Sequence, residues 1–325
     1  MRRKLGRSNI EVSAMGMGCW AIGGPYTNEK NLPCGWGDVD DQESIRTIHR
    51  AIDLGVTFFD TAACYGCGHS EEILGGSLQS KRKQVVIATK FWHTFDTHNR
   101  ITAGTLEDPS RIASSVKDSC QRLRTDYIDL LQFHQGNYPA DQAGKIRDAC
   151  QMLVDEGVIR AYGWSTDDPG RAAVFAKGKD CAAIQMRLNV LQRNDESIAL
   201  CEQENLASIN KGPLIKGLLT GKFDRQSQFA DNDVRKPWWD LQDGAEGDML
   251  DQLDKIRQVL TSDGRTLAQG ALGWIWARSD VTIPIPGCRT VKQIEENAAA
   301  MDFGPLSDAQ MRQIDEILGL DRTEN

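Results

Sequence analysis

Short apolar runs alternate with longer amphipathic segments along almost the whole chain, and this alternation most strongly limits how the chain can fold. Eight runs are apolar or β-branched almost throughout, as expected of parallel strands that are covered on both faces. These candidate strands are residues 14–20, 57–60, 85–90, 128–134, 159–165, 183–186, 206–210 and 281–285. Segments with helical spacing separate or follow them, at 41–54, 70–80, 109–123, 142–156, 169–177, 196–204 and 291–300.

Eight strands, each usually followed by a helix, predict an α/β protein with a single (β/α)8 TIM-barrel domain over residues 1–325. A doubly wound sheet would need a glycine-rich dinucleotide turn after its first strand, and residues 15–20 offer only two glycines. Three segments lie outside the eightfold pattern. We expect an N-terminal hairpin at 4–13 that caps the barrel floor, a long polar loop at 223–247 over the mouth, and a C-terminal helix at 306–318 that Ser307 and Gln310 cap.

Charge and cysteine content narrow the class of protein. The net charge of -8 argues against a nucleic-acid partner, because such binding depends on clustered Lys and Arg. No apolar run approaches the roughly 18 residues of a membrane helix, and no apolar segment follows the basic start, so we expect a cytoplasmic protein without a membrane partner. The nine cysteines are odd in number and irregularly spaced, which predicts free thiols.

Four ionisable residues follow neighbouring strands at the end of a barrel where enzymes of this fold carry their chemistry. They are Asp60, Tyr65, Lys90 and His134. An ammonium from Lys90 is expected to lower the pKa of Tyr65 and so make the phenol a usable acid or base. Asp60 can orient Lys90, and His134 can position a substrate oxygen by a hydrogen bond. This set suits protonation of a carbonyl oxygen while another group, such as a hydride, attacks the carbon.

The same residues lie in motifs that resemble those of the aldo-keto reductases. Residues 55–75, GVTFFDTAACYGCGHSEEILG, look like the first signature of that family, and ATK at 88–90 and DLLQFH at 129–134 fit the later ones. The resemblance implies a (β/α)8 barrel that binds NADPH across its mouth and reduces aldehydes and ketones. It also implies that Asp60, Tyr65, Lys90 and His134 form the catalytic tetrad, with Tyr65 as the proton donor.

The resemblance further implies a set of cofactor contacts. At the nicotinamide end these are Trp20, Asp60, Ser165, Thr166, Gln185 and Lys211; at the pyrophosphate loop Gly212, Pro213, Leu214, Gly217 and Lys222; at the adenosine end Gly287, Arg289, Gln293, Glu296 and Asn297. Two positions depart from the family: Thr166 replaces the usual Asn, and Lys211 stands where members often have Tyr or Arg. Because a guanidinium can grip a 2′-phosphate with two hydrogen bonds, Arg289 favours NADPH over NADH.

The pocket for the substrate is expected to be aromatic and apolar. Its candidate residues are Trp20, Tyr65, Trp92, His134, Trp238 and Trp239, although ordinary loop packing is the alternative for the tryptophans. Such a lining suggests an uncharged, moderately bulky aldehyde, ketone or sugar-like carbonyl. Cys64 and Cys67 with His69 could form a redox pair or half of a zinc site, but no second ligand pair follows, so we expect incidental cysteines and no metal.

Two other functions stay open. The chain could be a regulatory protein that binds NADPH and reports redox state with little turnover. A lyase or isomerase that uses Lys90 as a Schiff base is less consistent with the sequence, because pairing with Asp60 would keep the amine protonated. We expect a small-molecule carbonyl as the partner, and a monomer or a weak homo-oligomer.

Overall fold

Eight parallel strands form a nearly closed barrel in the computed structural model, which describes residues 1–106 and 108–320. In barrel order the strands are β3 (Gly16–Gly18), β5 (Phe58–Asp60), β6 (Val86–Phe91), β9 (Ile128–Phe133), β10 (Ile159–Ser165), β11 (Cys181–Arg187), β12 (Ala207–Lys211) and β13 (Thr282–Pro284). The Gly18 N–H donates to the Pro286 carbonyl at 2.9 Å, which joins the last strand region to the first. All eight predicted strands, and with them the predicted fold class, are confirmed, with small shifts at the strand ends.

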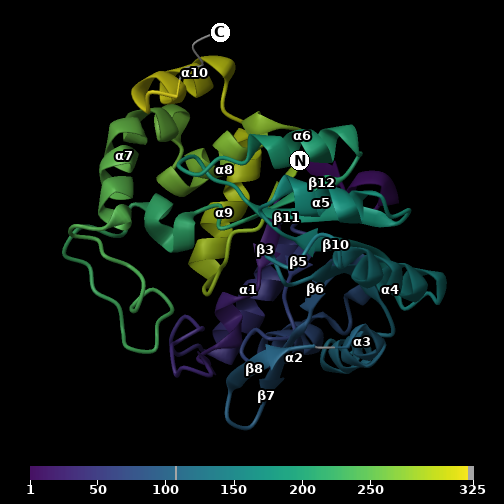
Figure 1. Cartoon of the computed structure of the whole chain (residues 1–325). Helices are drawn as coiled ribbons and strands as arrows, with labels where there is room; N and C mark the ends of the chain where they lie inside the picture. The colour runs from purple at the N-terminus through teal and green to yellow at the C-terminus, as the bar shows by residue number, and fades with distance from the viewer. Residues whose placement is uncertain (107, 321–325) are drawn as a thin grey trace.

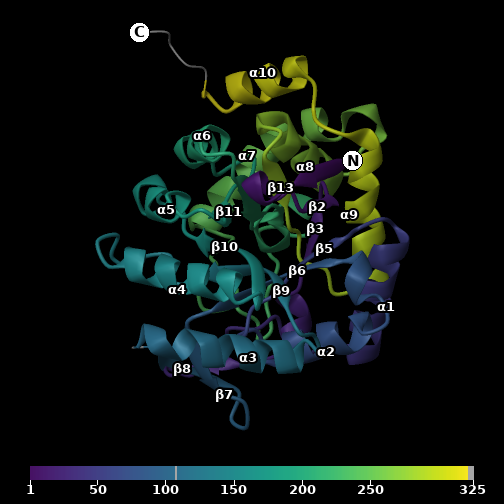
Figure 2. The ribbon, with the colours of Figure 1, turned by 90° about the vertical axis from the view of Figure 1, so that its right-hand side faces the viewer.

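Helices surround the barrel on its outer face, and the last helix lies at one end of the molecule (Figures 1 and 2). They are α1 (Asp41–Asp53), α2 (His69–Leu78), α3 (Ile112–Arg122), α4 (Ala143–Asp155), α5 (Pro169–Ala176), α6 (Asp195–Gln203), α7 (Ala245–Leu260), α8 (Leu267–Arg278), α9 (Val291–Phe303) and α10 (Asp308–Ile317). The predicted helices are present, and α10 begins with the expected capping box of Ser307 and Gln310. Helix α7 was not predicted, because its start follows directly on the long polar segment.

The barrel interior is apolar toward its floor and polar toward its mouth. The N-terminal hairpin, β1 (Arg2–Lys4) paired antiparallel with β2 (Glu11–Ser13), places Leu5 and Val12 against interior strand residues such as Phe58 and Leu130. The predicted floor cap is therefore confirmed. Side chains alternate along a strand, so the residues two positions further toward the mouth share the same interior face. The floor thus determines which strand residues point inward at the active end.

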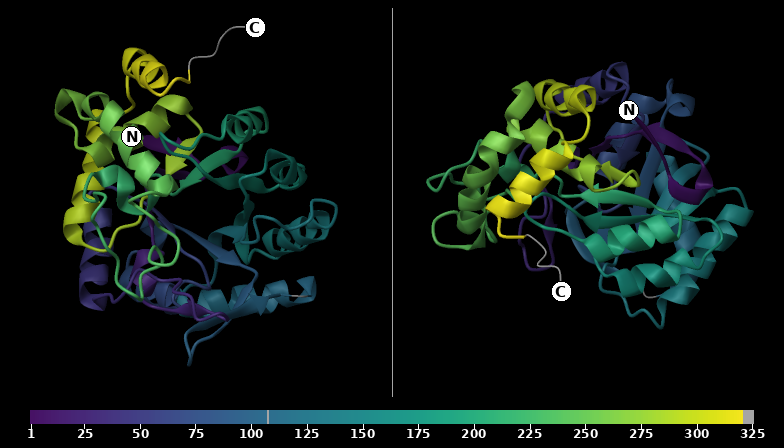
Figure 3. Two further views of the ribbon diagram at one scale, coloured as in Figure 1. Left: turned by 60° about the vertical axis from the view of Figure 1, so that its left-hand side comes forward. Right: turned by 90° about the horizontal axis from the view of Figure 1, so that it is seen from above.

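The long segment that follows β12 lies at the mouth of the barrel, as predicted. Figures 1 and 3 show it at the end opposite to α10 and the chain's N-terminus, beside the segment that precedes α1. The Val234 N–H donates to the Gly35 carbonyl at 2.7 Å, which fixes the two segments to each other. Three further short strands, β4 (Thr27–Asn28), β7 (His93–Asp96) and β8 (Ile101–Thr105), form a separate small sheet in segments outside the predicted strands and helices.

The remaining composition-based predictions concern cysteines and membrane segments. All nine cysteines are free thiols, as predicted. Within residues 1–106 and 108–320, none of the helices combines the length and the apolar character needed to cross a membrane. The same part of the chain holds no cluster of three or more His, Cys, Asp or Glu side chains that could bind a metal ion.

Candidate active site

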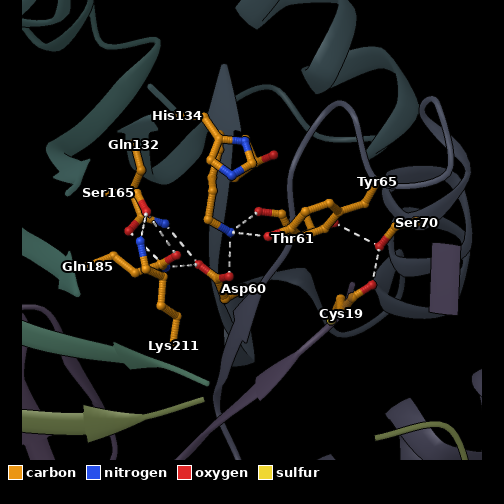
Figure 4. A network of polar contacts seen from close by, with 12 residues as sticks. Cys19, Asp60, Thr61, Tyr65, Ser70, Gln132, His134, Ser165, Gln185 and Lys211 are labelled. Carbon is orange, nitrogen blue, oxygen red and sulfur yellow. Dashed lines mark hydrogen bonds and ion pairs between the residues drawn. The ribbon is translucent and has the colours of Figure 1, made fainter. Parts of the chain in front are cut away.

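The four ionisable side chains predicted from the strand ends converge at the mouth of the barrel, where Figure 4 labels Asp60, Tyr65 and His134. The ammonium of Lys90 lies 2.5 Å from Oδ1 of Asp60 and 3.3 Å from the hydroxyl of Tyr65. It also donates to the carbonyl of Thr61 at 2.8 Å, so all three of its N–H donors have partners. The ring of His134 lies 5.9 Å from the ring of Tyr65, centroid to centroid, with its edge toward it.

A tight loop after β5 positions Tyr65. The Ser70 hydroxyl donates to the Cys19 carbonyl at 2.7 Å, and the Ser70 N–H donates to the Tyr65 carbonyl. Gly66 has a φ of +59°, and a Cβ there would lie 1.9 Å from the Gly23 carbonyl oxygen. Only glycine fits this close approach, which explains the Tyr-Gly pair in the motif.

Asp60 is fixed by two buried amides that the sequence reasoning did not single out together. Its Oδ2 accepts a hydrogen bond at 2.8 Å from Nε2 of Gln132 and another at 2.8 Å from Nε2 of Gln185. Gln185 was predicted as a cofactor contact, whereas Gln132 was missed. The signal for Gln132 was present in the sequence, because it lies two residues after the interior-facing Leu130 and two before His134.

The prediction that Lys90 lowers the pKa of Tyr65 is wrong for this structure. Burial of the phenol raises its pKa well above 10, and the nearby carboxylate of Asp60 raises it further. The hydroxyl is therefore protonated at neutral pH and available as a proton donor. The ammonium 3.3 Å away would stabilise the phenolate as that proton leaves.

His134 is held in a neutral form by its surroundings. Burial lowers its pKa well below 6.5, and the positive charge of Lys90 acts in the same direction. Its backbone N–H donates to the Phe91 carbonyl at 3.1 Å, and its carbonyl lies 2.8 Å from Nε2 of His93. The neutral ring can thus donate one hydrogen bond through one nitrogen and accept one through the other.

The predicted substrate pocket is brought together only in part. Trp20 stacks on Tyr65 at 5.8 Å and 23°, and so forms one wall of the site. Trp92 is buried in the layer between sheet and helices, where it contacts Phe133. On the long loop, Trp238 is 62% exposed, while Trp239 packs against Phe223 and Phe229. None of these last three tryptophans has a described ring contact with Tyr65 or His134.

The residues predicted for the nicotinamide end lie next to the tetrad. The Ser165 hydroxyl is 3.4 Å from Oε1 of Gln185, and Nζ of Lys211 is 3.3 Å from that same hydroxyl (Figure 4). Lys211 also pairs with Asp167 at 3.4 Å, and burial lowers its pKa. Thr166 does not share this arrangement, because its hydroxyl donates to the backbone carbonyl of Gly136 at 2.9 Å.

The segment after β12 forms a compact turn surrounded by cations. Gly212 and Gly217 have positive φ values of +63° and +96°, while Pro213 and Leu214 are buried. Lys222 reaches back over this turn toward Gly217. Lys216 and Arg235, which the sequence reasoning did not name, lie in the same region; burial lowers the pKa of Lys216, and the charges of Arg187 and Arg235 lower it further. An anion placed here would relieve this mutual repulsion.

The residues predicted for the adenosine end have different environments. The guanidinium of Arg289 donates to the backbone carbonyls of Trp36 and Asp38 at 2.8 and 2.7 Å. Gln293 accepts the Arg289 N–H through its side chain, and Gly287 is exposed beside Gly18. Asn297 is buried and donates to Sγ of Cys288, and Glu296 accepts from Gln269 through its backbone. Within residues 1–106 and 108–320, Arg289 has no side-chain hydrogen bond beyond these two, so its guanidinium has further N–H donors available, whereas the Asn297 amide is engaged with Cys288.

The similarity to known proteins covers almost the whole chain, including the barrel strands and the four ionisable residues. The model of the Aldo/keto reductase family matches residues 14–319. The chain is 31% identical to the NADH-specific methylglyoxal reductase of Escherichia coli (97% of this chain, 98% of the relative). It is 29% identical to the NADP(+) aldo-keto reductase yakc of Schizosaccharomyces pombe (97% and 90%). The solved structure of a glycerol dehydrogenase from Gluconobacter oxydans matches with a TM-score of 0.80 at 31% identity (97% and 95%).

Proposed function

The chain belongs to the aldo/keto reductase family of oxidoreductases, and from this premise we propose that it reduces an aldehyde or ketone carbonyl with NADPH, with Tyr65 as the proton donor. The observation that carries the proposal is the position of Lys90, whose one ammonium contacts both Asp60 and the Tyr65 hydroxyl in a buried site. The reverse reaction, oxidation of an alcohol, would use the same groups in reverse.

The chemistry of the chain's own residues follows from this geometry. A carbonyl oxygen placed between Tyr65 and His134 would accept hydrogen bonds from both, which polarises the carbonyl. As negative charge develops on that oxygen, the Tyr65 proton moves to it, and Lys90 stabilises the phenolate that remains. Asp60 holds the Lys90 ammonium in place throughout. When bound, NADPH would supply the hydride that attacks the carbonyl carbon.

The residues around the mouth of the barrel fit a nicotinamide dinucleotide that carries a 2′-phosphate. Ser165 and Gln185 offer a hydroxyl and an amide for the nicotinamide carboxamide, and Lys216 and Lys222 offer cations for the pyrophosphate. Arg289 has donors beyond the two that bind backbone carbonyls, which supports a contact with a 2′-phosphate. One relative is named as NADH-specific and another as NADP(+)-dependent, so our preference for NADPH rests on Arg289.

The substrate class follows from the walls near Tyr65. Trp20 stacks on the Tyr65 ring, and Trp36 packs edge-on against Trp20 at 5.0 Å. These aromatic surfaces favour an uncharged aldehyde, ketone or sugar-like carbonyl over a charged one. The names of two relatives, a methylglyoxal reductase and a glycerol dehydrogenase, support a small oxygenated substrate in the first panel to be tested.

The deciding experiment follows NADPH oxidation by absorbance against a panel of aldehydes, ketones and sugars, with NADH in parallel. Tyr65→Phe should lower kcat by about 10²- to 10⁴-fold, because general acid catalysis typically contributes that much. Its dissociation constant for NADPH should remain unchanged. Tyr162→Phe is the matched control: it also removes a buried hydroxyl, one that donates to Gln151 at 3.1 Å in the barrel wall, and should keep kcat.

Three outcomes would oppose parts of the proposal. If Tyr65→Phe keeps most of its kcat, Tyr65 is not the proton donor. Tight NADPH binding without turnover of any carbonyl or alcohol would favour the redox-sensing alternative. Absence of NADPH binding would refute the assignment of Arg289 and its neighbours to the cofactor.

A further inference from the structure

The imidazole of His134 has one side-chain hydrogen-bonding partner in the described part of the chain. Sγ of Cys64 lies 3.6 Å from Nδ1 of His134, within hydrogen-bonding range for sulfur. Cys64 is the residue immediately before Tyr65, on the loop after β5, whereas His134 directly follows β9. The backbone of His134 is fixed on both sides by hydrogen bonds to Phe91 and His93. The position of the ring relative to Cys64 is therefore set by two adjacent barrel segments.

The protonation states of the two groups determine the direction of this hydrogen bond. A neutral imidazole carries one N–H and one acceptor nitrogen. Burial raises the pKa of Cys64 to about 12, so its sulfur keeps a proton at neutral pH. Burial lowers the pKa of His134, and the charges of Lys90, His93 and Lys211 act in the same direction. The contact thus joins a protonated thiol to a neutral ring.

The hydrogen bond can then run in two directions, from Nδ1–H to the sulfur or from the thiol to Nδ1. The two differ in whether the buried thiol hydrogen has an acceptor. If Nδ1 carried the hydrogen, the weak acceptor sulfur would receive it, and the buried S–H would lack a described acceptor. If the thiol donates instead, the better acceptor, an imidazole nitrogen, receives the hydrogen bond. Burial favours the second arrangement, since an unpaired polar group is costly in a low-dielectric site.

We propose that Cys64 is a positioning residue that holds His134 as the Nε2–H tautomer, so that the ring presents an N–H donor to the substrate oxygen beside the Tyr65 hydroxyl. The effect on catalysis rests on the proposed carbonyl reduction, whereas the assignment of the tautomer does not. A carbonyl oxygen needs donors on both sides as its negative charge grows. With the opposite tautomer, Nε2 would offer a lone pair and repel that oxygen.

The structure separates the two cysteines of the Cys64-x-x-Cys67 pair and supplies a matched control. Cys67 is buried on the same loop, but its described surroundings include Arg100 and Asp96 rather than His134. Both cysteine side chains are buried, so removal of either thiol takes one buried sulfur atom from the same loop. Only the loss of the Cys64 thiol should affect the imidazole.

The test measures the tautomer directly by nitrogen-15 NMR of histidine side chains. The chain has five histidines, and the His134 signals are assigned from their absence in His134→Gln. The unaltered protein, Cys64→Ser and Cys67→Ala should all show the Nε2–H pattern, because the serine hydroxyl still donates. Cys64→Ala should show a substantial Nδ1–H population. This readout needs no substrate, so it does not depend on whether the proposed activity is found.

Kinetics then test the consequence for catalysis. Cys64→Ala should lower kcat by roughly three- to tenfold, the range expected for loss of one hydrogen bond, while the NADPH dissociation constant stays the same. Cys64→Ser should restore most of the loss, and Cys64→Ala should have no further effect in a His134→Gln background. An unchanged tautomer in Cys64→Ala, or an equal loss of kcat in Cys67→Ala, would overturn the proposal.

Discussion

Removal of the Lys90 ammonium should destabilise the protein mainly through the carboxylate that it leaves behind. The Lys90 side chain is 0% exposed and that of Asp60 is 3% exposed, so neither charge is hydrated in the folded state. Breaking a buried ion pair by removing one partner typically costs about 3–5 kcal/mol. In Lys90→Met, Asp60 would still accept hydrogen bonds from Gln132 and Gln185, which places the expected loss near the lower limit, about 3 kcal/mol.

The double variant separates the loss of a charge from the loss of a contact. Lys90→Met combined with Asp60→Asn removes both charges, so it should be more stable than Lys90→Met alone although it carries one more substitution. The coupling between the two sites should approach about 3 kcal/mol, the upper range for directly interacting groups. Lys81→Met is the control. Lys81 is partly exposed, and its Nζ lies as far as 4.0 Å from Oδ1 of Asp53, so this ion pair is expected to contribute under about 1 kcal/mol.

The assay is unfolding in urea, monitored by tryptophan fluorescence and by far-ultraviolet circular dichroism. The slope of the unfolding free energy against urea concentration should be the same for all variants. A loss below about 1 kcal/mol in Lys90→Met would contradict the burial argument. So would a double variant that is less stable than Lys90→Met, because Asp60 would then be stabilised chiefly by the two glutamine amides.

Three further outcomes follow from the structure. Glu71→Gln should lower the free energy of unfolding by about 3 kcal/mol in urea titrations, because fully buried Glu71 pairs with Arg122 at 2.7 Å and accepts from Thr89. Stability should fall as the pH drops from about 6.5 toward the lowered pKa of His134, since the unfolded chain binds a proton there that the folded chain does not; His134→Gln should make the urea midpoint fall less steeply with pH, and the lowered pKa of His93 accounts for part of the slope that remains. Arg289→Leu should reduce the NADPH-to-NADH preference in kcat/KM by roughly tenfold or more, in line with the loss of a charge-assisted hydrogen bond.

The barrel could be predicted from the sequence because its strands satisfy a strict local requirement. β6 and β9 are buried along their whole length, and a strand covered on both faces must be apolar almost throughout. Helix α7 shows the limit of this reasoning. Its buried residues, including Leu253, Ile256 and Leu260, recur with helical spacing, but the polar segment before it concealed where the helix begins.

The four ionisable residues could be predicted because Asp60, Lys90 and His134 lie at strand ends and Tyr65 lies on the loop that follows β5, and strand ends meet at the mouth of a barrel. The protonation of Tyr65 could not be predicted, since the opposing effects of burial and of Lys90 depend on how completely the surrounding loops exclude water. The contact between Cys64 and His134 joins positions 70 residues apart through side-chain rotamers, and no local pattern encodes it.

The two adjacent tryptophans of the long loop show why pocket walls are harder to predict than strand ends. The loop is fixed at Arg235, whose guanidinium pairs with Asp233 at 2.6 Å and lies over the rings of Trp36 and Phe229. Trp239 is drawn into this same cluster of aromatic rings around the cation. Its neighbour Trp238 points away and stays exposed. From the sequence both have the same expectation, because their difference arises from Arg235, which Asp233 holds within the long loop and whose guanidinium lies over Trp36 of the segment before α1. Since that segment also supplies the Trp36 and Asp38 carbonyls that bind Arg289, the shape of the mouth and the environment of Arg289 depend on the same contacts.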